Sequence, residues 1–233
     1  MGASLKDMNP FVECSTLPVS TRPVDLTSTH LKDYSLVVLF SASWPEIESV
    51  SRAAREASTP FIWGCTLGGA GVVFNDLGVH HYVDERPKEG GDAQENETYT
   101  VQGEIIYRSL WDTLSTPLNR RGRRDKPMYA VLRACYRAYT ESGVDMGPAA
   151  APVVKQVRDA MCAEENIPLD RIPDATIDTM LLAPKDVSAV CTVVGGVVGN
   201  EVIRAVSGKG LPMDNIFLYN LHDGWGKIEK HPL

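Results

Sequence analysis

Residues 190–207 read VCTVVGGVVGNEVIRAVS, and this nearly charge-free stretch decides the fold. Its apolar residues predict a helix, although Gly195, Gly196 and Gly199 each lower helix propensity by roughly 1 kcal/mol. We therefore expect a sheet or a partner chain to approach the helix closely at these glycines. The stretch is too short and too glycine-rich for a membrane span, so the sequence predicts a helix buried against protein.

The composition is that of an ordinary globular domain. The chain has 233 residues, 43% of them hydrophobic, and a net charge of −7. No run reaches the roughly eighteen uninterrupted apolar residues of a spanning helix, and polar Lys6, Asp7 and Asn9 stand where a signal peptide would be apolar. We expect an intracellular protein with no membrane partner, and the acidic balance argues against nucleic acid as the main partner.

The five cysteines form no pattern typical of a disulfide framework or of a zinc site. Their number is odd and no C-x-x-C pair occurs among them: Cys14, Cys65, Cys135, Cys162 and Cys191. We expect reduced thiols and no metal site.

Strand and helix signals alternate in the first third of the chain, which is typical of an α/β fold. The expected elements are strands at 11–17, 34–40 and 61–65 and a helix at 45–58. The continuous apolar run at 34–40 predicts a parallel strand covered on both faces.

Short strands and then helices follow. The pattern predicts strands at 72–74, 79–84 and 101–107, a flexible loop at 85–98, helices at 128–142 and 149–166, and a closing hairpin of strands 215–221 and 226–230. The breakers Gly143, Gly147 and Pro148 separate the two helices, and His222-Asp223-Gly224 supplies the hairpin turn.

A phosphate-binding loop is the first chemical motif to consider. The best candidate, Gly68-Gly69-Ala70-Gly71, continues into β-branched residues of a strand and does not open a helix, which favours a tight turn. The glycines of 190–207 lie inside a helix and not before one, so they favour close packing over phosphate binding.

Single residues offer weaker candidates for chemistry. Cys65 stands at the end of a predicted strand, but no nearby cation stabilises a thiolate, so packing is the favoured interpretation. His80 and His81 adjoin on a strand and must face opposite sides, so they do not bind one metal together. We expect solvated charges at the last group of candidates, Asp84, Glu85 and Asp92.

A dense basic cluster, Arg120-Arg121-Gly122-Arg123-Arg124-Asp125-Lys126, precedes a predicted helix. A nuclear-localisation signal, an electrostatic handle for an acidic partner and a solvated loop all fit this composition.

Several segments in order resemble one protein family. Asn9-Pro10 stands before a predicted strand, with Met8 in place of the family's leucine, and Val73-Phe74-Asn75-Asp76-Leu77-Gly78 resembles a later phrase. The match is strongest over residues 190–205, and the aromatic strand at 215–219 closes the series. The chain resembles the smaller, non-catalytic, Aos-like subunits of the heterodimeric SUMO-activating enzymes, in the ubiquitin-activating-enzyme or ThiF family.

The resemblance implies a particular architecture. It is an α/β, Rossmann-like adenylation domain of the ThiF/MoeB type that lacks its first strand-turn-helix, with a helical insertion and a closing antiparallel hairpin. The chain begins at the family's Asn-Pro segment, so we expect a single incomplete domain, 1–233, shortened at its amino terminus. Its parts are a sheet half at 1–84, a flexible loop at 85–98, a strand and helical region at 99–184, and a buried helix with terminal strands at 185–233.

The resemblance also implies a role without chemistry of its own. In the family the larger subunit binds ATP and Mg²⁺, adenylates the carboxy-terminal glycine of the modifier and captures it on a cysteine. The smaller subunit supports that reaction as a heterodimer in the nucleus and cytoplasm. We therefore expect no catalytic, cofactor-binding or metal-binding residue here, and a partner interface at Val194, Gly195, Gly196, Val198, Gly199 and Ile203.

Two other functions stay open. The chain fits a stand-alone remnant or interaction module with the same fold and no activation role, because a sheet without its first strand has an unpaired edge. An autonomous ATP-using enzyme of the bacterial sulfur-carrier-adenylating kind ranks last, because it requires the glycine-rich loop that we do not find.

Overall fold

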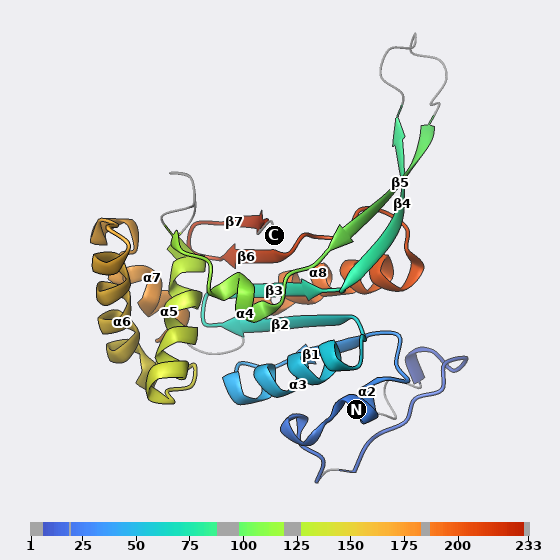
Figure 1. Ribbon diagram of the computed structural model, residues 1–233, viewed down its shortest axis with the longest axis horizontal. Coiled ribbons are helices and arrows are strands. Elements are labelled where there is room, and N and C mark those ends of the chain that lie inside the picture. The colour runs from blue at the N-terminus through green and yellow to red at the C-terminus, as the bar shows by residue number, and fades with distance from the viewer. Residues whose placement is uncertain (1–6, 19, 88–97, 119–126, 183–186, 231–233) are drawn as a thin grey trace.

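A mixed five-stranded sheet with helices on both faces forms the body of the protein (Figure 1). The computed structural model describes residues 7–18, 20–87, 98–118, 127–182 and 187–230. The strand order is β1-β2-β3-β6-β7, and β4 and β5 form a separate two-stranded sheet. Among the pairings of these seven strands, β1 with β2 is parallel and the others are antiparallel.

The strands agree closely with the alternation in the sequence. Their bounds are β1 Val37–Phe40, β2 Phe61–Leu67, β3 Ala70–Asp76, β4 Val79–Pro87, β5 Thr98–Ile106, β6 Ile216–Asn220 and β7 Trp225–Glu229. The predicted closing hairpin is confirmed, with Gly224 in the left-handed region at its turn. The hairpin between β2 and β3 turns at Gly68 and Gly69, so this glycine run forms a tight turn.

The long helices were also predicted, whereas the short ones were missed. The α-helices are α2 Ser28–Leu31, α3 Trp44–Glu56, α4 Leu110–Leu114, α5 Pro127–Ser142, α6 Ala151–Glu164, α7 Asp174–Leu181 and α8 Ser188–Ser207, and 3-10 turns lie at Pro23–Asp25, Pro148–Ala150 and Leu169–Arg171. Helix α3 carries Pro45 in its first turn and buries Ile47, Val50 and Ala54 along one stripe.

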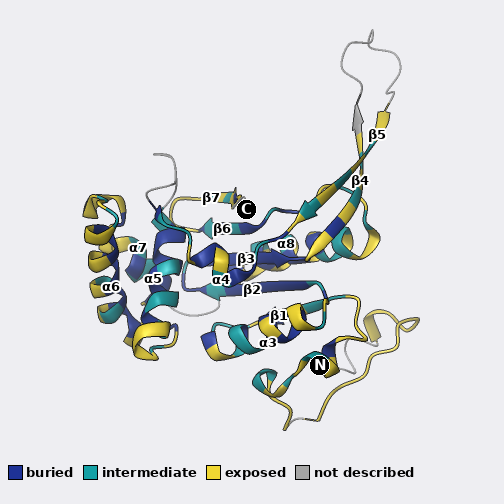
Figure 2. Ribbon diagram, viewed as in Figure 1, coloured by how far each residue is buried: buried dark blue, intermediate teal, exposed yellow. Residues whose placement is uncertain are grey.

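The sheet separates a large core from a small one. On one face, Phe61, Trp63 and Cys65 of β2 join a cluster that contains residues of α3, α5, α6 and α7. On the other face, Ile62 and Val73 join a small cluster with α8. Figure 2 shows a dark, buried centre in β2, β3 and α5, with exposed colours on the outer sides of α6 and α8.

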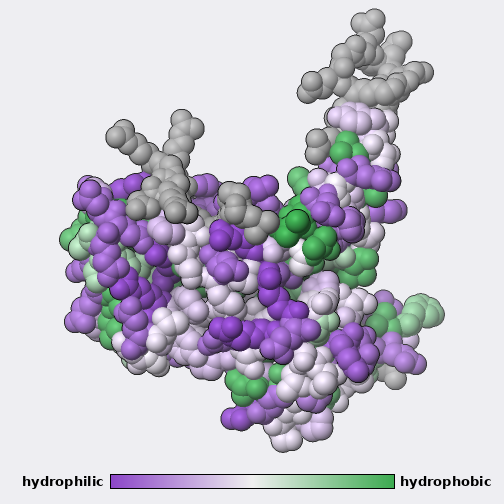
Figure 3. Space-filling model, in the orientation of Figure 1, coloured by the Kyte–Doolittle hydropathy of each residue, from purple (hydrophilic) through white to green (hydrophobic). Residues whose placement is uncertain are grey.

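Strands β4 and β5 form a twisted ribbon that projects from the body (Figure 1). Its exposed apolar residues are Val79, Val83, Tyr99 and Ile106, and apolar surface is visible along it in Figure 3. The ribbon is tied down at its base, where the amide of Tyr107 donates to the carbonyl of Gly78 at 2.8 Å.

Some expected elements are wrong. Residues 11–17 form no strand and are exposed, because no neighbouring strand offers them hydrogen bonds. Residues 85–87 and 98, which we expected in the flexible loop at 85–98, belong to β4 and β5. Residues 88–97 and 119–126, and with them Asp92 and the whole basic cluster, lie outside the described residues. Strand β1 was predicted to be covered on both faces, but it is covered on one face only. On the open face, the side chains of Val38 and Phe40 are 38% and 61% exposed.

Candidate partner-binding surface

Helix α8 packs on the sheet through one narrow row of valine side chains. Val190, Val194 and Val198 are at most 3% exposed and pack over β2 and β3. Close approach depends on glycines in the strands: a methyl group added to Gly71 would lie 2.6 Å from Cγ2 of Val194, and one added to Gly64 would lie 3.2 Å from Cγ2 of Val198. The helix therefore reaches the sheet through strand glycines.

The glycines of α8 itself face open space. A methyl group added to Gly195, Gly196 or Gly199 would meet no described atom within 4 Å. Of the two contacts expected at these glycines, the sheet of this chain makes none, because the pattern in the sequence does not tell which side of the helix meets the sheet; contact with a partner chain stays a prediction. The helix is only partly buried, not enclosed by protein as expected.

The six predicted interface residues divide into two groups. Val194 and Val198 lie against the sheet and are not available to a partner, which corrects that part of the prediction. Gly195, Gly196 and Gly199 are exposed, as is Ile203, whose exposed fraction is 65%. We call Gly196, Gly199, Ile203 and Val206 the outer face of α8.

Length and composition alone would let α8 cross a membrane. Its 20 residues include an 18-residue window of mean hydropathy 1.5, so the expectation that it is too short for a span is wrong. In the structure 22% of that window is buried: the valine stripe packs on the sheet and Glu201 lies in a polar cluster, while the rest of the helix is open.

A buried polar cluster fixes the carboxyl half of α8. The carboxylate of Glu201, 3% exposed, accepts hydrogen bonds from Nδ2 of Asn75 at 2.7 Å and from the amide of Met213 at 2.7 Å. Nη1 of Arg204 lies 2.6 Å from its other oxygen. These bonds join α8 to β3 and to the segment before β6, and satisfy a charge that would be costly to bury alone.

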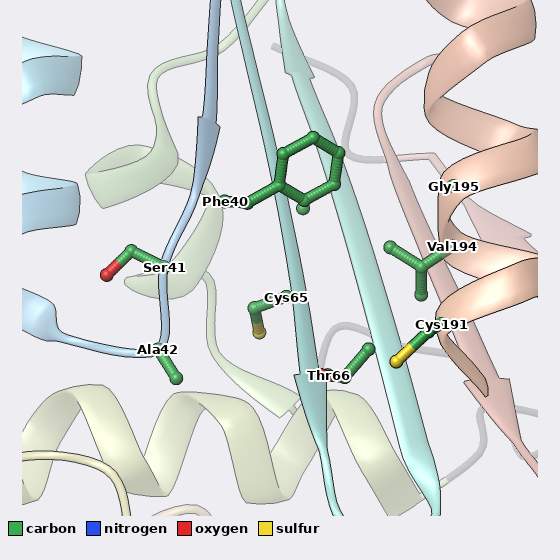
Figure 4. A pocket seen from close by; sticks show the side chains of 9 residues that line it. Phe40, Ser41, Ala42, Cys65, Thr66, Cys191, Val194 and Gly195 are labelled. Carbon is green, nitrogen blue, oxygen red and sulfur yellow. The ribbon is translucent and has the colours of Figure 1, made fainter. Parts of the chain in front are cut away.

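A groove of about 550 Å³ opens between β1, β2 and the amino half of α8. Figure 4 shows Phe40 and Thr66 directed toward α8, whereas Cys65 points to the opposite face of the sheet. The lining residues carry no charge: Phe40, Ser41, Ala42, Gly64, Cys65, Thr66, Cys191, Val194 and Gly195. This composition suits apolar contact with a polypeptide better than acid–base chemistry.

Two thiols, those of Cys65 and Cys191, lie at the groove, and its lining residues include no charged side chain. Burial raises the pKa of Cys65 far above its ordinary value, and the nearby Cys135 acts in the same direction. Cys191 is exposed on α8, but Cys65 points away from it across β2 (Figure 4). Cys65 therefore packs in the large core, as the sequence suggested, with no base or cation among the groove residues.

The two histidines lie on opposite sides of β4, as predicted. His80 is buried, and burial with the neighbouring His81 lowers its pKa, while Glu201 acts in the opposite direction. The exposed His81 places Nδ1 3.4 Å from a carboxylate oxygen of Glu104. In the part of the chain that the structure describes, no group of His, Cys, Asp and Glu residues is arranged to hold a metal ion.

The sequence reasoning missed the groove and the open side of β1. The only signal was the position of Phe40, an aromatic residue at the end of a short strand that we expected to be covered on both faces. Burial of a strand depends on its neighbours in space, and these are not visible in the run of apolar residues itself.

Comparison with known proteins gives relatives over almost the full chain. No family model matches it. The chain is 27% identical over 233 residues to SUMO-activating enzyme subunit 1B-1 of Arabidopsis thaliana, an alignment that covers 97% of this chain and 68% of the relative. It is 27% identical to SUMO-activating enzyme subunit 1 of Danio rerio over 248 residues, covering 95% and 69%. The Rattus norvegicus protein of the same name is 23% identical, covering 96% and 69%. Homologues across most of the chain are thus subunit 1 proteins, the smaller subunit of SUMO-activating enzymes.

Proposed function

We propose that the chain is a non-catalytic subunit that supports ATP-dependent activation of SUMO by the larger subunit of a SUMO-activating enzyme. The observation that carries this proposal is the similarity to subunit 1 proteins over 97% of the chain. The mixed parallel and antiparallel sheet is consistent with the ThiF-family fold of these homologues. ATP and Mg²⁺ would bind at the larger subunit, and SUMO would be an indirect partner.

The chemistry of the described residues supports a role without catalysis. The glycine run at Gly68 and Gly69 is a hairpin turn and opens no helix, the thiols beside the groove are buried or lack a neighbouring base, and the two histidines point apart. Two described hydroxyls donate to carboxylates at 2.5 Å, Ser41 to Glu46 and Ser109 to Asp112, and each pair stands at the start of a helix, where such bonds hold the first turn.

The outer face of α8 is our proposed contact for the larger subunit. No atom of this chain lies within 4 Å of a methyl group added at Gly196 or Gly199, so a partner backbone could approach the helix closely there. Beside these glycines, Ile203 and Val206 are 65% and 63% exposed and offer apolar surface. A heterodimer of this kind would work in the nucleus and cytoplasm.

The substitution Gly196→Leu tests this contact. Because Gly196 faces open space, the leucine does not disturb the core, and replacing glycine inside a helix should maintain or slightly raise the melting temperature. The added side chain should nevertheless prevent close approach of the larger subunit and lower its co-purification at least tenfold. Ala163→Leu adds the same side chain at an exposed position of α6 and is the matched control.

Two results would overturn the proposal. Equal recovery of the larger subunit, taken from the same organism, with Gly196→Leu and with Ala163→Leu would remove the outer face of α8 from the interface. ATP–pyrophosphate exchange with SUMO by this chain alone would show that it is a catalyst in its own right.

The alternative is a stand-alone interaction module with the same fold and no activation role. The open side of β1 favours it, because an unpaired strand edge is a site for other chains. A folded, monomeric chain that does not bind the larger subunit would support this alternative.

A further inference from the structure

The exposed side of α8 has the spacing of a helix-pairing surface. Opposite the valine row, exposed positions follow one another in alternating steps of three and four residues, the heptad spacing at which one helix packs along another. These positions are Ala189, Thr192, Gly196, Gly199, Ile203 and Val206. We call these six residues the seam of α8. The seam contains the outer face and extends it by two residues toward the amino terminus.

The seam carries no charge. Residues 188–207 include two charged side chains, Glu201 and Arg204, and these pair with each other at 2.6 Å. Glu201 is also buried on the side of α8 that faces the sheet. A neutral seam has no side chain that would repel an identical seam, so a second copy of the chain is a compatible partner.

Side-chain size increases along the seam. Small Ala189 and Thr192 lie toward its amino end, and two glycines lie at its centre. Ile203 and Val206, which are 65% and 63% exposed, lie toward its carboxyl end. In a parallel pair of such helices the large residues would face each other and hold the small residues apart. In an antiparallel pair the large residues of each copy face the small residues of the other, so the two helices touch along their whole length.

The antiparallel arrangement gives every residue of the seam a counterpart in the second copy. A twofold axis between positions 197 and 198 relates the two helices, and each pair is centred on that axis. The pairs are Gly196 with Gly199, Thr192 with Ile203, and Ala189 with Val206. Because the glycines meet at the centre, the helix axes can approach more closely than the usual distance of about 8 to 10 Å. The positive amino end of each helix also lies near the negative carboxyl end of the other.

We propose that α8 binds α8 of a second copy of this chain, antiparallel and through the seam, so that the chain alone is a reversible homodimer. One pair of 20-residue helices, each about 30 Å long, buries less surface than the roughly 1,200 to 2,000 Å² of a stable complex. The dimer should therefore dissociate on dilution. It hides the outer face, so the larger subunit and a second copy exclude each other; this consequence, unlike the homodimer itself, rests on the proposed function.

Sedimentation equilibrium of the full chain measures the self-association. Between about 1 μM and about 200 μM, we expect the mean mass to rise from that of one 25.5 kDa chain toward twice that value. A dissociation constant between these limits is the expected result.

Two substitutions test the antiparallel register. Thr192→Glu and Ile203→Lys should each weaken the dimer roughly tenfold or more, because each places two unpaired charges in the seam. An equal mixture of the two variants should form a mixed dimer roughly tenfold tighter than either variant alone. In that dimer the new carboxylate of one copy faces the new ammonium of the other, and the second pair of these positions keeps its native residues. A parallel pair does not bring positions 192 and 203 together.

The variants are chosen to leave the fold unchanged. Both positions are exposed, and the new charges suit the helix dipole, with an acidic residue in the amino half and a basic residue in the carboxyl half. At a concentration where the wild-type chain is monomeric, both should melt close to it. Ala163→Lys adds a charge at an exposed position of α6 and is the matched control, which should dimerise as the wild type does.

Three outcomes overturn the proposal. They are a chain that stays monomeric at the highest concentration, a dimer that neither variant weakens, and a mixture that is no tighter than the single variants. None of these measurements uses the larger subunit. If the dimer forms as expected but the larger subunit binds without displacing the second copy, the proposed contact for that subunit is wrong and the homodimer stands, so the two failures are distinguishable.

Discussion

Arg55 shows how one partly exposed residue connects three elements. Its Nε donates to Oδ2 of Asp76 at 2.7 Å, and its Nη2 donates to Oδ1 at 3.1 Å and to the carbonyl of Tyr107 at 2.9 Å. The guanidinium thus links α3 to the end of β3 and to the base of the ribbon. The side chain of Asp76 is only 2% exposed, so its charge depends on this partner.

At the residue scale we predict that Arg55→Ala lowers the free energy of unfolding by about 2 to 3 kcal/mol. The loss is smaller than the roughly 3 to 5 kcal/mol typical of a fully buried pair because Arg55 is itself 43% exposed. Denaturant unfolding measures the change. The exposed ion pair of Arg22 and Asp25 provides the control, since Arg22→Ala should change stability far less.

The pH dependence of the same variant follows from Asp76. Burial raises the pKa of Asp76, while Arg55 acts to lower it. A raised pKa in the folded state means that stability is lost as the pH rises through that value, and removing Arg55 extends this loss. As the pH rises above the ordinary pKa of an aspartate, about 4, the free energy of unfolding of Arg55→Ala should therefore fall more than that of the wild type. Adding Asp76→Asn should abolish the additional loss, and a difference that does not change with pH would contradict this account.

At the element scale, the contact between α8 and the sheet is decided by glycines in the strands. Gly71 leaves the space that Val194 fills, and Gly64 leaves the space that Val198 approaches. The helix glycines Gly195, Gly196 and Gly199 contribute nothing to this contact. The same residue type thus has opposite roles in the two layers.

A matched pair of substitutions separates these roles. Gly71→Ala places a methyl group 2.6 Å from the stiff side chain of Val194 and should lower the free energy of unfolding by about 1 to 3 kcal/mol. Gly196→Ala meets open space and should raise it by up to about 1 kcal/mol. Denaturant midpoints of the two variants check the prediction, and it fails if both substitutions shift stability in the same direction.

Particular elements show how far the sequence could predict the structure. Helices α3 and α5 were predicted because their apolar periodicity and flanking breakers are local properties. The hairpin of β6 and β7 was predicted because its turn residues are consecutive in the sequence. The open face of β1 and the orientation of the α8 glycines were not predicted, since both depend on which element lies alongside. For the same reason, four of the six predicted interface residues are exposed, while Val194 and Val198 belong to the core.

At the scale of the whole molecule, the two faces of the sheet differ in depth. The large core joins β2 and β3 to helices α3, α5, α6 and α7, whereas the small core is covered mainly by α8. Only four of the residues in α8 are buried: Val190, Val194, Val198 and Glu201. Local stability should follow this asymmetry.

Native-state hydrogen exchange tests that expectation. Amides of α8 should exchange through a local opening with a lower free energy than amides of α5, which buries eight residues in the large core. Binding of a partner to α8 or to β1 should reduce the difference. Equal opening free energies in α5 and α8 of the isolated chain would contradict this view.

The uncovered side of α8 and β1 should also make the lifetime of this protein in a cell depend on how much of its partners is present. A copy without partners displays Phe40, Ile203 and Val206, the kind of surface that chaperones and proteases recognise on unassembled subunits. In the proposed assembly, a copy bound to its partners would hide these residues. The lifetime of the chain in a cell should therefore follow the abundance of its partners, so that surplus copies are removed and the stoichiometry of the assembly is kept.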